Sequence, residues 1–516
     1  MTCDPFTISV IQAGLTAAAD EMFAVLRKTA MSPIIYEVLD VGTGIMDGTG
    51  NLVSSGAGIP TFVGVLDKAV QFIIGKHGQT IAEGDVFVTN DPNFGGVTHL
   101  NDVVIAKPVF FDGECVAWTA SIAHWGDVGG KVPGSMATDV TEIFAEGLRL
   151  PCVRLIEKGR EIAGVFDIIR VNSRLPDFVK GDLWAQLAAS RSAEKQINSL
   201  FKTYGTAAVL QAIEDAYDTA LTRSKEGLAG LPKGTFAIEE EQDDGAIWRS
   251  SITITDDEFL VDLRDNPIEL DGPYNTSRDG SVISCQMIFK ALTDPERFAN
   301  AGSFAPLRVL TKEKTIFHAG PTAPQGYYFE TRIRLFDLLW QCMAKAIPER
   351  LPAGSFSSIF GTVIAGVHPD FERNYTMVEP QMGGWGATSE RDGMSAMFST
   401  SHGDTFNCPV EICEARYGLN VVQKGLAERA EYRNGYSGGH GVRLEYELRA
   451  DAILSAGYTR ARIPVWSKDS CPPGGVNSLT VVRKTGEPER YQFVSGLKLT
   501  TGDRVIIQSA NGGNSN

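Results

Sequence analysis

Residues 90–102, NDPNFGGVTHLND, and residues 122–127, IAHWGD, contain the same spacing, a histidine followed three positions later by an aspartate. The four residues are His99, Asp102, His124 and Asp127. Imidazole nitrogens and carboxylate oxygens suit divalent zinc, manganese or iron. No other segment of the sequence is as dense in groups that can bind a metal or move a proton.

Both His-x-x-Asp units are predicted to lie at the ends of β-strands. One unit precedes a strand over 103–106, and the other follows a strand over 115–123. Side chains of a strand alternate between its two faces, so residues three apart come together only where the chain turns. The nearby glycines, Gly95 and Gly96 before the first unit and Gly129 and Gly130 after the second, allow such turns. Loops held by a rigid sheet commonly carry functional side chains.

Spacing alone leaves two interpretations of this stretch open. In the first, the histidines and Asp102 bind a divalent metal, and Asp40, just before a predicted hairpin at 44–53, supplies a further carboxylate. In the second, these acids, together with Glu142 and Glu146, are loop caps and surface groups around two ordinary histidines. The sequence pattern does not choose between them.

The whole chain predicts an α+β protein of several domains, with mixed sheets, helical hairpins and a β-rich C-terminal region. Its 516 residues are too many for one ordinary domain. An amphipathic helix is predicted from Asp4 to Thr29, and a helical pair over 176–227. The predicted units are an N-terminal metal-bearing α/β domain with a helical hairpin (1–232), a central α+β domain (233–435), a β-rich C-terminal region (436–510) and a disordered tail (511–516).

Composition limits the partners. The formal net charge is -16 and no Lys/Arg run offsets it, which argues against nucleic acid and anionic membranes as partners. The 8 cysteines are scattered without a Cys-x-x-Cys pair, which indicates reduced, mostly buried thiols. The N-terminus has no secretory signal pattern, and no run of about 18 apolar residues predicts a membrane span. A cytoplasmic location is the default expectation.

Two glycine-rich loops, 383–386 and 438–441, do not match a phosphate-binding loop. The sequence therefore predicts no ATP site in this chain, and the loops fit tight backbone turns better. The other histidines, His402 among them, have no recognisable spacing and are interpreted as structural. Glu379 is interpreted as a surface carboxylate.

The chain resembles the B subunit of the hydantoinase/oxoprolinase family over most of its length. Motifs that carry the resemblance include Asp4-Pro5, the Asp40 segment, Ala57-Gly58-Ile59-Pro60, Asn90-Asp91-Pro92, Thr98-His99-Leu100 with Asp102, His124 with Asp127-Val128-Gly129-Gly130, Thr141-Glu142-Ile143, Glu146-Gly147-Leu148-Arg149, Ala185-Gln186, Gly383-Gly384 and Pro409-Val410-Glu411. This family includes ATP-dependent hydantoin and lactam amidohydrolases, 5-oxoprolinase, and ATP-dependent acetone and acetophenone carboxylases.

The resemblance implies a heteromeric hydrolase that opens a lactam, hydantoin or 5-oxoproline-like ring. A separate hydantoinase A-type subunit would bind ATP and Mg, and this B-type chain would carry a divalent metal, Zn, Mn or Fe. Carried over by position, the metal ligands are Asp40, His99, Asp102 and His124. Asp127 or Glu142 is expected to be a catalytic proton shuttle or to orient an imidazole. A bound metal could lower the pKa of water toward neutrality.

Two alternatives remain beside the hydrolase. The chain could belong to a ketone carboxylase that uses bicarbonate and ATP, or be a non-catalytic scaffold subunit. Three departures from the family pattern bear on substrate class more than on the metal. Phe62 stands where the family usually has His, residues 438–441 lack an Arg-Gly-Gly continuation, and the usual four-glycine tail is reduced to Asn511-Gly512-Gly513.

Overall fold

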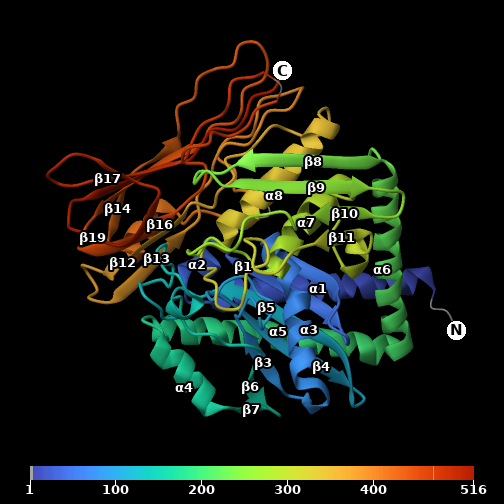
Figure 1. Ribbon diagram of the computed structural model, residues 1–516. Coiled ribbons are helices and arrows are strands. Elements are labelled where there is room, and N and C mark those ends of the chain that lie inside the picture. The colour runs from blue at the N-terminus through green and yellow to red at the C-terminus, as the bar shows by residue number, and fades with distance from the viewer. Residues whose placement is uncertain (1–3, 401, 404, 469) are drawn as a thin grey trace.

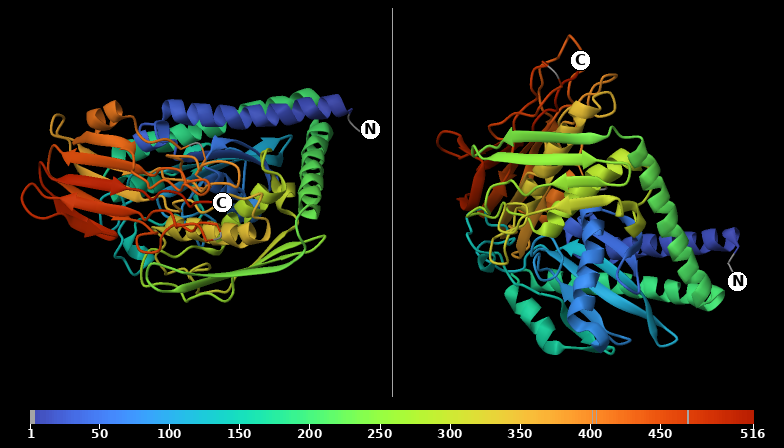
Figure 2. Two further views of the ribbon diagram at one scale, coloured as in Figure 1. Left: turned by 90° about the horizontal axis from the view of Figure 1, so that it is seen from above. Right: turned by 45° about the vertical axis from the view of Figure 1, so that its right-hand side comes forward.

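The N-terminal helix α1 (Pro5–Thr29) begins where the sequence predicts, because the Asp4 side chain accepts hydrogen bonds from the backbone N–H groups of Phe6 and Thr7. A computed structural model describes residues 4–400, 402–403, 405–468 and 470–516. By length and composition alone α1 could cross a membrane. In the fold it lies beside α5 (Pro176–Tyr204), as Figure 2 shows, and buries one apolar face: Ile11, Leu15, Ala18, Ala19, Met22 and Leu26.

A seven-stranded sheet forms the centre of the N-terminal part, in the order β2-β1-β5-β4-β3-β6-β7 with every neighbouring pair antiparallel. Helices α1 and α5 cover one face, and α3 (Pro60–His77) covers the other (Figure 1). Both faces are therefore buried, which explains the almost continuous apolar sequences of the central strands. The strands are β1 (Val41–Asp47), β2 (Leu52–Gly58), β3 (Val86–Thr89), β4 (Asp102–Phe111), β5 (Glu114–His124), β6 (Val153–Glu157) and β7 (Arg160–Glu161).

Shorter helical elements complete the N-terminal part. These elements are α2 (Pro33–Tyr36), α4 (Ala163–Asn172) and the 3-10 turns η1 (Gly78–Thr80) and η2 (Ile143–Ala145). The predicted helical pair is present as α5 and α6 (Thr206–Ala229), which meet at Gly205. In Figure 1, α6 rises along one side of the molecule to the second sheet. The predicted change from helix to strand occurs between Ala229 and Gly234.

The second sheet has the order β11-β10-β9-β8, and β10 and β11 run parallel. Its strands are β8 (Gly234–Glu241), β9 (Ile247–Ile254), β10 (Phe259–Asp262) and β11 (Leu307–Leu310), with η3 (Ala301–Phe304) before the last. Helices α7 (Arg278–Thr293) and α8 (Tyr328–Ala346) share an apolar core with these strands. The N-terminal end of α8 extends to the candidate site.

Two further sheets build the C-terminal part and contribute to one core. One contains β12 (Gly361–Val367), β13 (Asn374–Glu379), β16 (Ala452–Gly457) and β19 (Phe493–Leu499). The other contains β14 (Leu419–Leu426), β15 (Val442–Leu448), β17 (Ser478–Val482), β18 (Glu489–Tyr491) and β20 (Arg504–Gln508), and α9 (Val410–Arg416) precedes it. Because β12 pairs with β16 and β14 with β15, the predicted boundary at 435/436 falls inside both sheets.

The predicted disorder of residues 511–516 is wrong. Gly512 donates its N–H to the Gly439 carbonyl, and Ser515 and Tyr436 exchange two backbone hydrogen bonds. The glycines explain this packing, because a Cβ on Gly438 would lie 1.9 Å from the Gly512 oxygen. The two glycine-rich loops and the tail thus pack backbone against backbone, and the glycines in them have no positive φ. Close approach, and not turn geometry, is the reason for these glycines.

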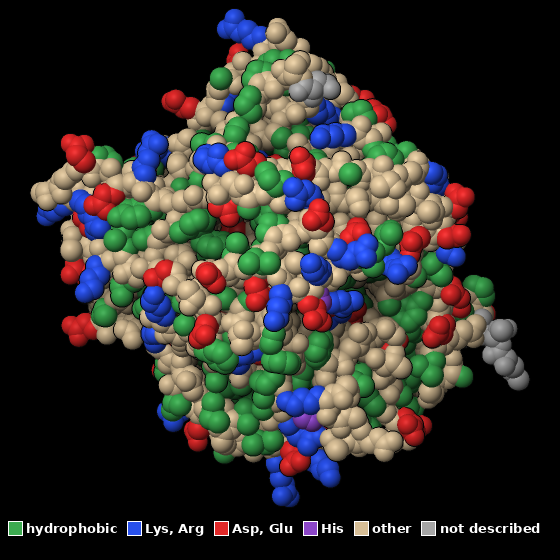
Figure 3. Space-filling model, viewed as in Figure 1, with side chains coloured by type: hydrophobic (Ala, Val, Ile, Leu, Met, Phe, Trp, Pro, Cys, Tyr) green, Lys and Arg blue, Asp and Glu red, His purple; other side chains and the backbone are tan. Residues whose placement is uncertain are grey.

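The surface mixes both signs of charge. Basic and acidic side chains are interspersed over the face that Figure 3 shows. The seven cysteines of the described chain have free thiols, and six of them are buried, as the sequence predicts. The α+β fold class with several sheets and helical layers is confirmed.

Candidate metal centre

Three neighbouring strands end side by side and present the predicted ligands in one row. In the register of β4 and β5, Asp102 stands opposite His124. On the other side of β5, Val41 pairs with Ala123, and the His124 N–H donates to the carbonyl of Asp40. Asp40, His124 and Asp102 therefore lie side by side at the same end of three inner strands, although they come from separate parts of the chain.

His99 joins this row through a turn. The Asp102 N–H donates to the His99 carbonyl, so residues 99–102 fold back before β4 begins. The turn brings His99 Nε2 to 3.2 Å from Asp102 Oδ1, and ligand atoms of His99, Asp102 and His124 all lie within 4.8 Å of one another. Neighbouring ligands about 2.1 Å from a tetrahedral ion are about 3.4 Å apart. The spacing of the three side chains is of the size that one ion requires.

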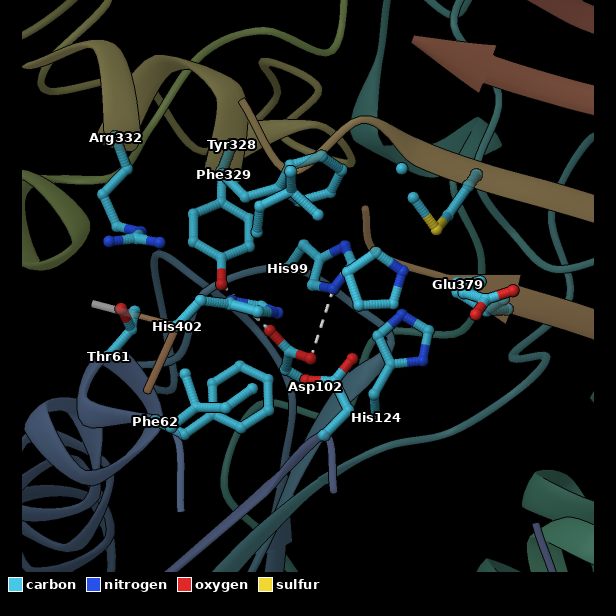
Figure 4. A pocket seen from close by; sticks show the side chains of 17 residues that line it. Thr61, Phe62, His99, Asp102, His124, Tyr328, Phe329, Arg332, Glu379 and His402 are labelled. Atoms are coloured by element: carbon cyan, nitrogen blue, oxygen red, sulfur yellow. Dashed lines mark hydrogen bonds and ion pairs between the residues drawn. The ribbon is translucent and has the colours of Figure 1, made fainter. Parts of the chain in front are cut away.

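The other carboxylate oxygen of Asp102 is already held by neighbours. Thr98 and Tyr328 donate their hydroxyls to Asp102 Oδ2, the tyrosine at 3.3 Å. Oδ1 is therefore the oxygen directed toward the histidines (Figure 4). Hydrogen bonds of this kind fix the orientation of a ligating carboxylate.

The pocket around the cluster is built by all three parts of the chain. The N-terminal part contributes the four predicted ligands and Phe62, and α8 contributes Tyr328, Phe329 and Arg332. The C-terminal part adds Ile359, Val378, Glu379 and His402. Figure 4 shows these groups around His99 and Asp102. Pockets at junctions between folded units are frequent small-molecule sites.

Burial and mutual charge set the ionisation of the cluster. Burial lowers the pKa of His99, but the Asp102 carboxylate outweighs this and raises it overall. Burial raises the pKa of Asp102, and the nearby histidines, His99 first, bring it below its usual range. Burial and the charge of Asp102 raise the pKa of Asp40 well above the ordinary value, and burial lowers the pKa of His124 to about 4.

Unsatisfied polar atoms in the row fit a bound cation. Asp40 Oδ1 and His124 Nδ1 are buried and have no hydrogen-bond partner among the described residues. Buried polar atoms are normally paired, so such atoms in a native site require an explanation. Two carboxylates and two imidazoles are also a donor set that zinc, manganese or iron accepts. Asp40 lies in the pocket but outside the tight cluster of three.

Residues 4–514 match the family model described as hydantoinase B/oxoprolinase. The chain belongs to this family. The beta subunit of the caprolactamase of Pseudomonas jessenii is 29% identical over 99% of this chain and 90% of that protein. The B subunit of a putative D-/L-hydantoinase from Pseudomonas sp. (strain NS671) is 27% identical, over 96% of this chain and 86% of that protein.

Solved structures agree with the hydantoinase B/oxoprolinase assignment. The crystal structure of the ATP-dependent caprolactamase from Pseudomonas jessenii has a TM-score of 0.92 at 25% identity, and the match covers 100% of this chain and 91% of that chain. A nucleotide-free acetone carboxylase structure has a TM-score of 0.87 at 15% identity, covering 99% of this chain and 76% of that chain. At that identity the likeness is one of fold alone.

Asp127 and Glu142, the residues predicted to be catalytic, do not line the pocket of this hydantoinase B/oxoprolinase chain. The buried Asp127 carboxylate accepts hydrogen bonds from the backbone of Gly129, Gly134 and Arg174 and from the Arg174 guanidinium at 3.0 Å. These partners organise the loop after β5, and no imidazole is among them in the described part of the chain. Glu142 is exposed at the start of η2. Neither side chain reaches the lining of this pocket, and the catalytic roles of Asp127 and Glu142 stay predictions.

Sequence reasoning missed two buried residues of the pocket. His402 is 5% exposed, and neither of its ring nitrogens has a hydrogen-bond partner among the described residues. Burial, aided by the Arg332 charge, lowers the pKa of His402 to about 3. Glu379 is buried, and its carboxylate accepts from the Cys408 N–H and the Tyr446 hydroxyl. Neither has a spacing that links it to the two His-x-x-Asp units.

Proposed function

We propose that this chain is the metal-bearing B-type subunit of a heteromeric ATP-dependent cyclic amide hydrolase. The substrate would be a lactam, a hydantoin or a 5-oxoproline-like ring. The observation that carries the proposal is the cluster of His99, Asp102 and His124, which faces a buried and largely apolar pocket. Relatives over nearly the full chain, named as components of a caprolactamase and of a putative hydantoinase, support the substrate class.

The cluster residues would hold the metal, with Asp40 as the further carboxylate. The donor set suits Zn, Mn or Fe, and the bound ion would supply Lewis-acid chemistry for a poorly electrophilic ring amide. The protein's own contribution is orientation: β4 and β5 hold Asp102 and His124 opposite each other, and the turn at 99–102 holds His99. Sites on rigid elements keep such geometry better than sites on mobile loops.

The pocket walls suit the hydrocarbon part of a small ring. Ile59, Phe62, Phe329, Ile359 and Val378 are buried apolar side chains in this lining. Apolar walls with a few convergent polar groups are typical of small-molecule sites. Phe62 replaces the histidine that the family usually has, and this makes one wall more apolar. A lactam with few polar substituents fits this lining best among the candidate rings.

His402 would contact the substrate. Its ring nitrogens lack protein partners among the described residues, and Figure 4 shows the ring between Tyr328 and Asp102. A neutral imidazole has one donor and one acceptor nitrogen, so it can hydrogen-bond either the N–H or the carbonyl of a ring amide. The lowered pKa keeps this imidazole neutral at pH 7.

ATP chemistry would belong to a partner. The sequence has no phosphate-binding loop. The names of the two relatives describe them as the beta and B components of their enzymes. We infer that ATP and Mg are held by a hydantoinase A-type subunit, which activates the ring carbonyl oxygen, in a hetero-oligomer in the cytoplasm.

The test is turnover by the complex purified with its A-type subunit. Caprolactam, hydantoin and 5-oxoproline would be supplied with ATP and Mg, and ring-opened product and ADP measured together. Ring opening that stops without ATP, and that is lost on chelation and restored by Zn, Mn or Fe, is the expected result. Consumption of acetone or acetophenone that depends on bicarbonate, without ring opening, would replace the proposal with the carboxylase. A complex that binds no metal and turns over none of these substrates would indicate a scaffold.

A further inference from the structure

The Glu146 carboxylate lies outside the pocket lining, and it is joined to His99 through one residue, Gly326. Glu146 is 2% exposed. Its Oε1 accepts a hydrogen bond from the Gly326 N–H at 2.6 Å, and its Oε2 accepts from the Gln325 N–H at 3.0 Å. Both donors are backbone groups of the segment just before α8. The carboxylate therefore fixes that segment in place.

The same Gly326 residue holds His99 on its other side. His99 Nδ1 lies 3.0 Å from the Gly326 carbonyl oxygen. A carbonyl oxygen only accepts hydrogen bonds, so Nδ1 must carry the proton. The remaining nitrogen, Nε2, is then the one directed at Asp102 and the cluster. In metal sites the hydrogen bond at one imidazole nitrogen sets which nitrogen is available as ligand.

The close approach of the two segments is specific. A Cβ on Gly326 would lie 2.9 Å from Glu146 Oε1, so the glycine leaves room for the short hydrogen bond. Gln325 is tied separately, because its side chain donates to Asn93 Oδ1 at 2.8 Å, and Asn93 donates to the Ala319 carbonyl. The 319–326 segment is thus held at several points, but within the described residues Glu146 is the carboxylate bound to Gly326, the residue whose carbonyl contacts His99.

We propose that Glu146 is a positioning residue of the metal centre, which acts through Gly326 to hold His99 with Nε2 directed at the metal. This inference rests on the proposed function, because it needs the metal site. Loss of an outer partner of this kind typically weakens metal binding about 10–100-fold. Glu146→Gln keeps the size of the side chain but offers only one acceptor oxygen to two N–H donors.

The test measures metal affinity of the full chain. Zinc would be titrated against a chromogenic chelator, and Glu146→Gln should bind zinc about 10–100-fold more weakly than wild type. Glu114→Gln is the matched control, because Glu114 is exposed at the end of β5 opposite to His124 and does not line the pocket. Its zinc affinity should equal that of wild type. An unchanged affinity in Glu146→Gln would overturn the inference.

Two further measurements separate positioning from general stability. Cobalt bound in place of zinc reports ligand geometry by visible absorption, and its spectrum should change in Glu146→Gln; a lower melting temperature with an unchanged spectrum and affinity contradicts positioning. If Glu146→Gln does not fold, nitrogen-15 NMR of metal-free wild type with labelled histidines can still show which nitrogen of His99 carries the proton. The His99 signals are assigned by comparison with His99→Gln. A proton on Nδ1 of His99 is expected, and one on Nε2 alone would overturn the inference. This readout does not depend on metal binding, so it stands apart from failure of the proposed function.

Discussion

Asp102, the first residue of β4, stands directly opposite His124, the last residue of β5, in the antiparallel register of the central sheet. The pair joins two otherwise separate His-x-x-Asp units. Asp102 belongs to the first and His124 to the second, whereas the aspartate of the second unit points into a loop. The proposed metal centre is therefore a cross-strand pair extended by His99 and Asp40, and not two copies of one motif.

Removal of a predicted ligand should abolish metal binding and ring opening together. His99→Ala should weaken zinc binding by more than about 100-fold, because it deletes a direct donor and exceeds the loss expected for an outer partner. Metal analysis and the ATP-dependent assay of the complex measure the two effects. His318→Ala is the control, since His318 lies outside this pocket. A His99→Ala protein with full metal content and turnover would refute the metal centre.

Substitution of His402 should separate substrate contact from metal binding. His402→Ala is expected to retain zinc at wild-type affinity, because the cluster of three excludes this residue. Ring opening by the complex should fall by about 100-fold, the size of effect typical of a lost proton-transfer or hydrogen-bonding group. Should the variant lose its metal instead, His402 would be a ligand; should it keep full activity, it would have no role in turnover.

Two Gly→Ala substitutions, one in a packed glycine-rich loop and one in α3, should change the stability of the fold in opposite directions. A Cβ at Gly438 would meet the Gly512 oxygen at 1.9 Å, so Gly438→Ala should destabilise the fold by about 1–3 kcal/mol, the usual cost of overpacking. Gly75, inside α3, has nothing within 4 Å of its Cβ position. Gly75→Ala should stabilise by about 0.5–1 kcal/mol. Denaturant unfolding of both variants checks this, and equal stabilities would contradict the ordered tail.

A buried charge cluster between β8, α8 and the C-terminal part predicts acid sensitivity. Glu240 contacts Arg334 and lies 2.9 Å from Arg460, and Asp337 contacts both arginines. Burial raises the pKa of Glu240, but the two guanidiniums outweigh this and bring it to about 2. The folded pKa lies below the unfolded one, so this stabilisation is complete above about pH 4.5 and is lost as pH falls toward 2.

Glu240→Gln tests this cluster at neutral pH. The variant leaves two buried guanidiniums with one carboxylate and should lose about 3–5 kcal/mol of unfolding free energy at pH 7. Its stability should then change less than that of wild type between pH 4.5 and 2. Glu239→Gln is a control, because that neighbouring side chain is largely exposed. If wild type and Glu240→Gln lose the same amount of stability as the pH falls, Glu240 is not the source of the acid sensitivity.

Local rules predicted most of the elements near the site. The Asp4 cap and Pro5 marked the start of α1, and the Asp47 to Gly50 turn marked the hairpin of β1 and β2. Apolar runs marked β4 and β5, so His124 was correctly placed at a strand end. These features depend on neighbours in sequence, and that is why pattern reasoning found them.

The same local rules could not predict which strands pair when the strands are far apart in the sequence. The pairing of β12 with β16 and of β14 with β15 joins segments on both sides of the predicted boundary at residue 435. The tail is ordered because its glycines fit against distant loops. His402 and Glu146 reach the site through contacts with residues far away in the chain. None of these contacts leaves a local spacing in the sequence.

Neighbouring residues in the sequence were enough to identify the residue types available as ligands and, through the resemblance, the family. This was possible because strand ends, turns and motifs are encoded by adjacent residues. The fold was needed to show that Asp102 pairs with His124, that Asp127 binds a loop instead, and that Glu146 is bonded to the residue that contacts His99. The physical reason is register: which side chains meet at a sheet edge depends on how distant strands align, and that alignment is set by the packing of the whole chain.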